Sequence, residues 1–312
     1  MMGSSIAHKL VELEVDVTLM DACIEPFGAN FFNIEAIKDK IKINISDIRD
    51  KESVKDLVTG KNIIFNLAGQ VSHNDSLDNP SLDADINYLG HLNILEAVRK
   101  YSPEAKILFP GSRLQFGVIE KTPVAEDHPL RPKTPYALNK AAAENLYLFF
   151  NRVYNISTVV FRIANPYGPR AQMRHSKYCI VNWFIRLAME NKPIKIFGKG
   201  SQIRDYIYID DLVNVFILAA ENEKSSGEVF NVGNNVGTKF RDMAKLIVEI
   251  VKSGRIEFVP WPENYINVET GDYITDITKV KKVLRWEPKI SLTEGIALTY
   301  EYYKKYRNYY WN

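Results

Sequence analysis

Short apolar runs of strand length alternate with helical patterns through the first half of the sequence, and this alternation limits the possible folds more than any other feature. The runs are rich in Ile, Val and Phe, which favours buried strands. Apolar residues recur at helical spacing over 81–100 and 136–152. Strands that alternate with helices pair in parallel, with helices on both faces of the sheet. We therefore expect a doubly wound α/β fold whose strands include 41–45, 62–67, 105–109 and 158–163.

The two ends of the sequence depart from this regular alternation. Ile6, Leu10 and Leu13 recur at helical spacing, and an alternating apolar segment follows them and ends at Asp21, so the chain opens inside an α/β unit. After Pro166 the alternation gives way to scattered Gly, Pro and charged residues, and an aromatic helical pattern closes the chain. A length of 312 residues suits two domains, or one domain with an added lobe. We expect a smaller C-terminal α/β lobe that closes over the ligand site of the sheet.

Composition excludes several classes of partner. Forty Lys and Arg against thirty-eight Asp and Glu leave a net charge of +2, which gives no bulk field for nucleic acid or an anionic membrane. No apolar run approaches the roughly 18 residues of a spanning helix, and the first residues lack a secretory signal. We therefore expect a cytoplasmic protein with no nucleic-acid or membrane partner. Cys23 and Cys179 lie far apart, without Cys or His at ligand spacing, so we expect neither a disulfide framework nor a metal site.

Tyr136 and Lys140 form the first candidate for catalysis. Pro135 stands where a helix would begin, and the spacing of four residues places both side chains on one face of that helix. A nearby ammonium favours the phenolate, so we expect Lys140 to lower the pKa of Tyr136 toward neutrality. This spacing alone is weak evidence, because a solvated helix surface often carries such a pair.

Other predicted strands end in residues suited to binding a ligand. Ser112 follows one strand, at the end where doubly wound sheets bind ligands, and its hydroxyl could hydrogen-bond a substrate oxygen. The small residues of NLAGQ would let a flat cofactor approach the backbone. Asp21 stands where a carboxylate can hold an adenosine ribose. Asp47 could meet the adenine, or it could simply cap its loop.

Together these motifs resemble the extended short-chain dehydrogenase/reductase superfamily, in its NAD-dependent epimerase/dehydratase branch that acts on nucleotide sugars. The resemblance covers nearly the whole chain, down to the ending LRWEPKISLTEGI. Several motifs in the right order are more specific than any one of them. In chain order they are Gly3, Asp21, Asp47, NLAG, Asn87 within NYLGHLNILEA, Ser112, YALNK, RIANPYGPR and GSQIRDYIYIDDL.

The resemblance implies a role for each of these residues. Tyr136 is the acid and base, Lys140 binds the nicotinamide ribose, and Ser112 orients the sugar hydroxyl. Residues 1–165 form the Rossmann-like NAD domain, to which strands and helices near 206–235 return, and 166–312 form mainly the substrate lobe. The expected substrate-binding residues are Asn165, Arg204 and Asp272. The expected cofactor-binding residues are Gly3, Asp21, Asp47, Ile48, Leu67, Ala68, Gly69, Asn87, Tyr136 and Lys140.

The sequence departs from the family pattern in three places. The family opens with a strand and G-x-x-G-x-x-G, and Gly3 matches only the last of these glycines. We therefore expect the central first strand and two glycines to be absent, and NAD binding to be weak. Ser112 is followed by Arg113, Leu114 and Gln115 instead of the Asp-Glu pair of dehydratases, which disfavours dehydration. Glu269 stands where 4-epimerases carry an Arg, which leaves the substrate open.

The expected activity is epimerisation of a nucleotide diphosphate sugar, at C4 through a 4-keto intermediate. The competing enzyme is a reductase of 4-keto-6-deoxy nucleotide sugars, which would consume NADH or NADPH. A truncated, non-catalytic nucleotide-sugar-binding protein is the alternative from another class, although Ser112, Tyr136 and Lys140 together argue against it. We also expect a homodimer through helices at 87–98 and 136–149, because the family pairs them. Apolar residues beyond one buried face are Leu89, Leu92, Ile94, Leu95, Leu146, Leu148 and Phe149.

Overall fold

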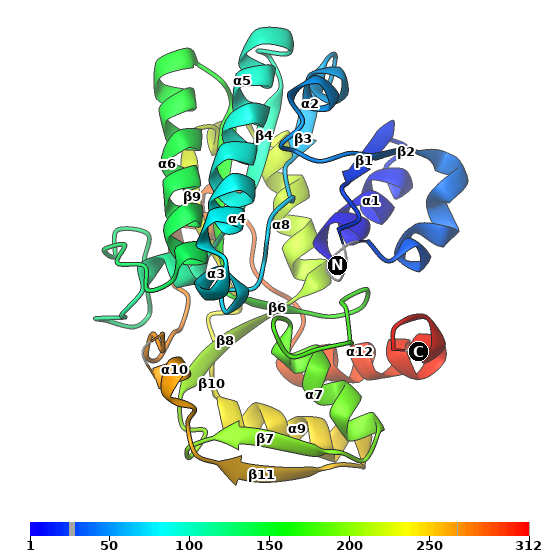
Figure 1. The fold of residues 1–312 in the computed structure, drawn as a ribbon, viewed down its shortest axis with the longest axis vertical. Helices are drawn as coiled ribbons and strands as arrows, with labels where there is room; N and C mark the ends of the chain where they lie inside the picture. The colour runs from blue at the N-terminus through cyan, green and yellow to red at the C-terminus, as the bar shows by residue number, and fades with distance from the viewer. Residues whose placement is uncertain (25–28, 267, 312) are drawn as a thin grey trace.

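A four-stranded parallel sheet forms the centre of the molecule (Figure 1). The computed structural model describes residues 1–24, 29–266 and 268–311. In the sheet, β4 pairs with β3 on one side and with β5 on the other, and β9 pairs with β5. The Rossmann-like α/β fold expected from the sequence is therefore confirmed. The strands, in spatial order, are β3 (Ile63–Phe65), β4 (Lys106–Ser112), β5 (Thr158–Ile163) and β9 (Glu228–Val232).

Helices cover both faces of this sheet. Ile107 and Phe109 of β4 pack into one apolar cluster with α2, α5 and α6. Leu108, which points to the opposite face, belongs to a second cluster with α8. Alternate residues of a strand point to opposite faces, so β4 contributes to two cores. The helices are α2 (Lys51–Val58), α3 (Asp75–Asp78), α4 (Pro80–Ala84), η2 (Asp85–Gly90), α5 (His91–Tyr101), η3 (Arg113–Phe116), α6 (Pro135–Tyr154), α8 (Ile209–Glu221) and η4 (Glu223–Ser225).

A separate pair of parallel strands lies beside the central sheet. β1 (Val17–Asp21) pairs with β2 (Ile41–Ile45), and α1 (Met2–Glu12) and η1 (Phe31–Lys40) pack against them. Within the described residues, β1 pairs with no other strand and β3 pairs with β4 alone. The Nζ of Lys61, next to β3, donates to Thr18 Oγ1 of β1 at 3.1 Å. The parallel sheet is thus divided in two where the resemblance places its first strand.

Most of the remaining elements build the lower lobe (Figure 1). One sheet has the order β10-β8-β6, and β11 pairs with β7 in another. The helix α9 packs against α7 and α12. The lobe comprises β6 (Asn165–Tyr167), α7 (Ile180–Met189), β7 (Pro193–Phe197), β8 (Ile203–Tyr208), β10 (Gly237–Lys239), α9 (Phe240–Val251), β11 (Arg255–Val259), α10 (Glu263–Ile266), α12 (Leu292–Tyr306) and η5 (Arg307–Tyr309). The helix α11 (Thr278–Leu284) instead packs against β9, α8 and η4, beside the central sheet.

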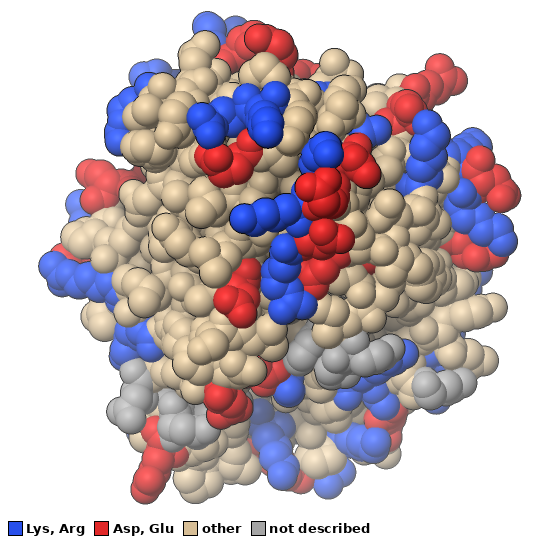
Figure 2. Space-filling view, turned by 45° about the horizontal axis from the view of Figure 1, so that its top comes forward, with Lys and Arg blue, Asp and Glu red and all other residues tan. Residues whose placement is uncertain are grey.

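The surface carries charges of both signs. Figure 2 shows acidic and basic side chains interspersed across one face, as the near-balanced composition leads one to expect. Among the described residues, no helix combines the length and apolar character needed to cross a membrane.

Candidate active site

One large cavity collects most of the residues that the sequence singles out. Its volume is about 1370 Å³, and it is lined by β1 and β3 along their length, by the carboxyl end of β4 and by residues of the lower lobe. Ligands bind at this end of the strands in open α/β sheets. The expected site residues that line it are Gly3, Asp21, Asp47, Ile48, Leu67, Ala68, Gly69, Ser112, Tyr136, Lys140, Asn165 and Arg204.

Ser112 and Tyr136 meet at the end of β4. Ser112 caps η3, since its Oγ accepts a hydrogen bond from the Leu114 N–H at 3.2 Å. Tyr136 is the second residue of α6, and the side chain of Thr134 caps this helix by accepting from the Ala137 N–H at 3.2 Å. The Tyr136 hydroxyl hydrogen-bonds with the Ser112 side chain. The two capping hydrogen bonds fix the starts of η3 and α6, where Ser112 and Tyr136 stand side by side.

The pKa of Tyr136 differs from the expectation. Burial raises it to about 12, while the hydrogen bond with Ser112 acts in the opposite direction. Burial also lowers the pKa of Lys140 to about 8, although Asp83 opposes this change. The prediction that Lys140 brings the phenol pKa toward neutrality is therefore wrong for this protein, because burial disfavours the charged form of both side chains. Lys140 Nζ lies 4.8 Å from the ring centre of Phe109.

The loop after β3 approaches α6 so closely that position 69 suits only glycine. A Cβ on Gly69 would lie 2.8 Å from Asn87 Oδ1 and 3.3 Å from Lys140 Nζ. Asn87 is fully buried in η2, and its Nδ2 donates to the Gln70 carbonyl at 2.9 Å and to Asp83 Oδ2 at 3.0 Å. Its Oδ1 has no hydrogen-bond partner in the part of the chain that the structure describes. Asn87 is not among the described residues that line the cavity, but its Oδ1 lies beside Gly69, which does line it, and could accept a hydrogen bond from a ligand there.

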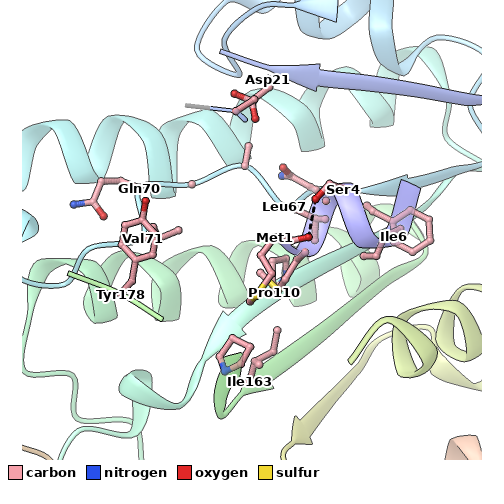
Figure 3. Close-up of a pocket in the computed structure, with 18 of the residues that line it drawn as sticks. Met1, Ser4, Ile6, Asp21, Leu67, Gln70, Val71, Pro110, Ile163 and Tyr178 are labelled. Carbon is pink, nitrogen blue, oxygen red and sulfur yellow. Dashed lines mark hydrogen bonds between the residues drawn. The ribbon is translucent and has the colours of Figure 1, made fainter. Parts of the chain in front are cut away.

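The first turn of α1 faces the same cavity. Figure 3 shows Met1 and Ser4 close to Leu67 and Pro110, with Asp21 at the end of β1. Met1 caps the helix without a side-chain hydrogen bond, and the first turn, which includes Gly3, carries no acidic residue. Unsatisfied N–H groups at a helix start favour an anion such as a diphosphate.

Two expected adenosine contacts also serve their own loops. Asp21 Oδ1 accepts from the Cys23 N–H at 2.8 Å. Asp47 Oδ2 lies 2.6 Å from Arg49 Nη2, and these hydrogen bonds with Arg49 lower the pKa of Asp47. Ile48 is buried against Gly90, where a Cβ would lie 2.5 Å from Ile48 Cδ1. Asp47 therefore caps its loop, and Ile48 contributes to the core, while both line the cavity.

The residues expected to hold the substrate lie across the cavity from α1. Asn165 Oδ1 accepts from Arg113 Nε at 3.2 Å. Arg204 is buried, and its Nη2 lies 2.5 Å from Glu269 Oε1, so the acidic residue that departs from the family pattern forms an ion pair with it. Asp272, in contrast, is not among the described residues that line the cavity: its Oδ1 accepts from the Ile203 N–H at 2.7 Å at the start of β8. This position gives no support to substrate binding by Asp272.

Two further residues, Asp83 and His73, emerge from the structure alone. Asp83 is a buried carboxylate that accepts from Asn87 and from Asn139 Nδ2, the latter at 2.8 Å. His73 lines the cavity, and burial followed by the charge of Arg113 lowers its pKa to about 4. No local signal distinguishes these residues from ordinary surface side chains. Among the described residues, no group of three or more His, Cys, Asp or Glu could hold a metal ion.

The cavity residues fit NAD, the cofactor that the resemblance implies. Gly69 leaves room where a side chain would collide with Asn87, and the buried Oδ1 of Asn87 lacks a donor. Asp21 stands at the end of β1 for an adenosine ribose, and the open first turn of α1 suits a diphosphate. Lys140, which the resemblance assigns to the nicotinamide ribose, lines the same cavity.

Comparison with known proteins agrees with this geometry. The family model described as GDP-mannose 4,6 dehydratase matches residues 1–299. The UDP-glucose 4-epimerase of Mycolicibacterium smegmatis is 30% identical over 306 residues, which cover 97% of this chain and 95% of that protein. Two solved structures share the fold over nearly their whole length.

The first of these is the UDP-glucose 4-epimerase of Thermotoga maritima with UDP-glucose, with a TM-score of 0.90 and 31% identity over 98% of this chain and 96% of that one. The second is the UDP-glucose 4-epimerase of Thermus thermophilus in complex with NAD, with a TM-score of 0.87 and 27% identity over 97% and 96% of the two chains. The chain therefore belongs to the NAD-dependent epimerase/dehydratase family of short-chain dehydrogenases/reductases, among its nucleotide-sugar epimerases.

Proposed function

We propose that the protein inverts C4 of the sugar in a nucleotide diphosphate hexose, through a 4-keto intermediate. The observation that carries this proposal is the cluster of Ser112, Tyr136 and Lys140 beside the Gly69 backbone in one cavity. A hydroxyl, a phenol and an ammonium at this place can bind a sugar hydroxyl and exchange its proton. Bound NAD supplies the site that accepts a hydride and returns it.

The side chains then have distinct tasks. Tyr136, in its ionised form, takes the proton of the sugar hydroxyl, and as the neutral phenol it gives this proton back after the keto sugar has presented its other face. Ser112 orients the same oxygen and hydrogen-bonds with Tyr136. Lys140 places a positive charge near the oxygen on which negative charge develops. Because the hydride and the proton both return, the reaction has no net redox change.

The residues after Ser112 argue against dehydration, even though the matching family model is named for a dehydratase. Gln115 is fully buried: its Oε1 accepts from the Ser112 N–H at 2.7 Å, and its Nε2 donates to Glu144 Oε2 at 2.7 Å. Arg113 stays protonated, and the side-chain amide of Gln115 is neutral and does not titrate. The two therefore cannot replace the acid and base of a dehydratase. Neither residue can remove and donate the protons that elimination of water requires.

UDP-glucose is the first substrate to test, because relatives at about 30% identity over nearly the full chain carry this substrate in their names. We expect the purified protein with NAD to convert UDP-glucose into UDP-galactose without net NADH formation, which proton NMR of the products and absorbance at the nicotinamide band would show. If UDP-glucose is inert, CDP-, GDP- and dTDP-hexoses form the next panel. Stoichiometric consumption of NADH or NADPH with a 4-keto sugar would identify a reductase instead.

Gly69→Ala is expected to weaken NAD binding by at least about tenfold, because the added Cβ would lie 2.8 Å from Asn87 Oδ1 and occupy the surface where a flat group can lie. Isothermal titration with NAD measures the effect. Gly271→Ala is the matched control, since no atom lies within 4 Å of a Cβ there and Gly271 is not among the described residues that line the cavity; its φ of +84° makes the substitution strained without placing an atom in the site. Equal NAD affinity in Gly69→Ala and the parent would remove the loop after β3 from the cofactor site.

We expect a homodimer formed through α5 and α6. Ile94 and Leu95 are buried in the protein's own core, so the interface has to use other residues than those two. Leu89, Leu138 and Phe149 remain exposed by 46%, 58% and 39% and supply apolar surface. Sedimentation should show a dimer at micromolar concentration, and Leu138→Glu should make it monomeric. Leu298→Glu on α12, at 45% exposure, is the control that should stay dimeric; a parent protein that sediments as a monomer would contradict the proposal.

A further inference from the structure

Arg113 is a cation in the cavity without a carboxylate partner. Its Nε donates to Asn165 Oδ1 and its Nη1 to Thr270 Oγ1, both at 3.2 Å, and its guanidinium lies 5.5 Å from the ring centre of Tyr273. These partners are neutral. Within the described residues, no ion pair joins Arg113 to an acidic side chain. A charge withdrawn from water is costly when nothing compensates it.

The nearest acidic side chain is already engaged by another arginine. Glu269 Oε1 lies 2.5 Å from Arg204 Nη2 and also accepts from the N–H groups of Thr270 and Gly271, at 3.1 and 3.0 Å. Arg204 completes its own bonding with the carbonyls of Ile203 and Gly271, at 2.9 and 2.8 Å. Arg204 and Glu269 therefore form a nearly neutral unit.

The surplus positive charge of this cluster consequently belongs to Arg113. Burial, and after it the charge of Arg204, lower the pKa of Arg113 to about 10, so the side chain remains protonated at neutral pH. His73 beside it is neutral at that pH, because its pKa is about 4. Arg113, Arg204, Glu269 and His73 all line the cavity that also holds Ser112. Arg113 is thus a cation without an acidic partner among the described residues, next to Ser112 in the lining of this cavity.

We propose that Arg113 binds an anionic oxygen group of the nucleotide-sugar substrate. This inference rests on the proposed function and assigns a ligand to Arg113 within the same cavity. A guanidinium offers planar, paired N–H donors that match both phosphate and carboxylate oxygens. Two groups of a nucleotide sugar have this chemistry: the diphosphate, and a carboxylate at C6 of a uronic acid sugar. Either would supply the negative charge that Glu269 does not provide to Arg113.

Binding of three probes distinguishes the two sources. UDP carries the diphosphate alone, UDP-glucose adds a neutral sugar, and UDP-glucuronate adds a carboxylate. Each is titrated by calorimetry into the full chain with NAD present, for the parent, Arg113→Gln and Arg113→Lys. We expect Arg113→Gln to bind at least about tenfold more weakly and Arg113→Lys to recover part of the loss, since the charge returns without the planar fork.

The pattern of loss identifies the group. An equal loss for all three probes assigns the diphosphate, whereas a loss confined to UDP-glucuronate assigns the sugar carboxylate; both support the proposal. Arg131→Gln is the control, because Arg131 is an exposed arginine already paired with Glu120, and its affinities should match the parent's.

Two results would overturn the proposal. The first is an Arg113→Gln variant that binds every probe within about twofold of the parent's affinity but has a lowered melting temperature. Arg113 would then only stabilise the fold through its hydrogen bonds with Asn165 and Thr270. The second is a parent protein that binds none of the probes. Binding that depends on Arg113 together with absent turnover would leave this inference standing and refute the proposed epimerase activity alone.

Discussion

Tyr136→Phe is expected to lower turnover by at least about 100-fold while substrate affinity changes little. The substitution keeps the aromatic ring on α6 and removes the hydroxyl that hydrogen-bonds with Ser112. Without that hydroxyl, no group of Tyr136 can take the proton from the sugar and return it. Initial rates with UDP-glucose and NAD measure turnover, and calorimetry with UDP measures binding.

Tyr147→Phe is the matched control for a buried hydroxyl on the same helix. The Tyr147 hydroxyl accepts from Asn66 Nδ2 at 2.7 Å and lies 3.1 Å from His91 Nδ1, away from Ser112. Its loss should lower the melting temperature, because a buried partner is left unsatisfied, but should keep turnover within a few-fold of the parent. Turnover of Tyr136→Phe within a few-fold of the parent, in a variant that still binds NAD, would remove Tyr136 from the chemistry.

The raised pKa of Tyr136 adds a pH signature to this prediction. With a pKa of about 12, only a small fraction of the phenol is ionised at neutral pH. As long as the pH stays well below this pKa, the ionised fraction rises tenfold for each unit by which the pH increases. Turnover of the parent should therefore rise from about pH 6 to about pH 8, above which Lys140, with a pKa of about 8, loses the positive charge that the reaction uses. The residual turnover of Tyr136→Phe should not follow the same rise.

The sequence predicted the sheet well where a strand is buried on both faces. Residues 158–163 are mostly apolar, with Arg162 as the one charged member, because β5 contributes to both cores, and the structure confirms the bounds Thr158–Ile163. The helical pattern at 81–100 is less regular in the structure, since η2 separates α4 from α5. The short strands of the lower lobe give no comparable pattern, because β6 and β10 have only three residues each.

The candidate site was predictable where one element fixes the geometry. Tyr136 and Lys140 share a helix, so their spacing alone places them together. The pair Arg204 and Glu269 is different, because 65 residues separate its members and only the fold brings them into contact. For the same reason, the sequence does not predict the hydrogen bond between Arg113 and Thr270. The raised pKa of Tyr136 could not be predicted from the sequence either, since burial of the side chain is its main cause.

The division of the parallel sheet has the second large expected consequence. β1 and β3 are both edge strands, and residues of both line the cavity, from Val17 to Met20 on one side and from Lys61 to Phe65 on the other. Each edge presents a row of backbone N–H and C=O groups that a neighbouring strand would satisfy. An unsatisfied buried group costs roughly 1–3 kcal/mol. Met1, the N-cap of α1, lies close to Leu67, which follows β3 (Figure 3).

We therefore expect an N-terminal extension that supplies a parallel strand between β1 and β3 to stabilise the protein and tighten NAD binding. The extension carries about six β-branched residues and ends in Gly-x-x-Gly just ahead of Gly3, so that its backbone N–H groups lie at the start of α1. The melting temperature should rise by at least about 5 °C, and the dissociation constant for NAD should fall at least about tenfold. Thermal melts and calorimetric titration of both forms measure the two effects.

The control is an extension of the same length made of Gly, Ser and Pro, which cannot pair along either edge. It should leave the melting temperature and the NAD affinity of residues 1–312 unchanged. If the strand-forming extension changes neither quantity relative to this control, the edges of β1 and β3 do not take a strand between them. If residues 1–312 already bind NAD as tightly as the extended form, the first turn of α1 holds the diphosphate without further glycines, and the expectation of weak binding is wrong.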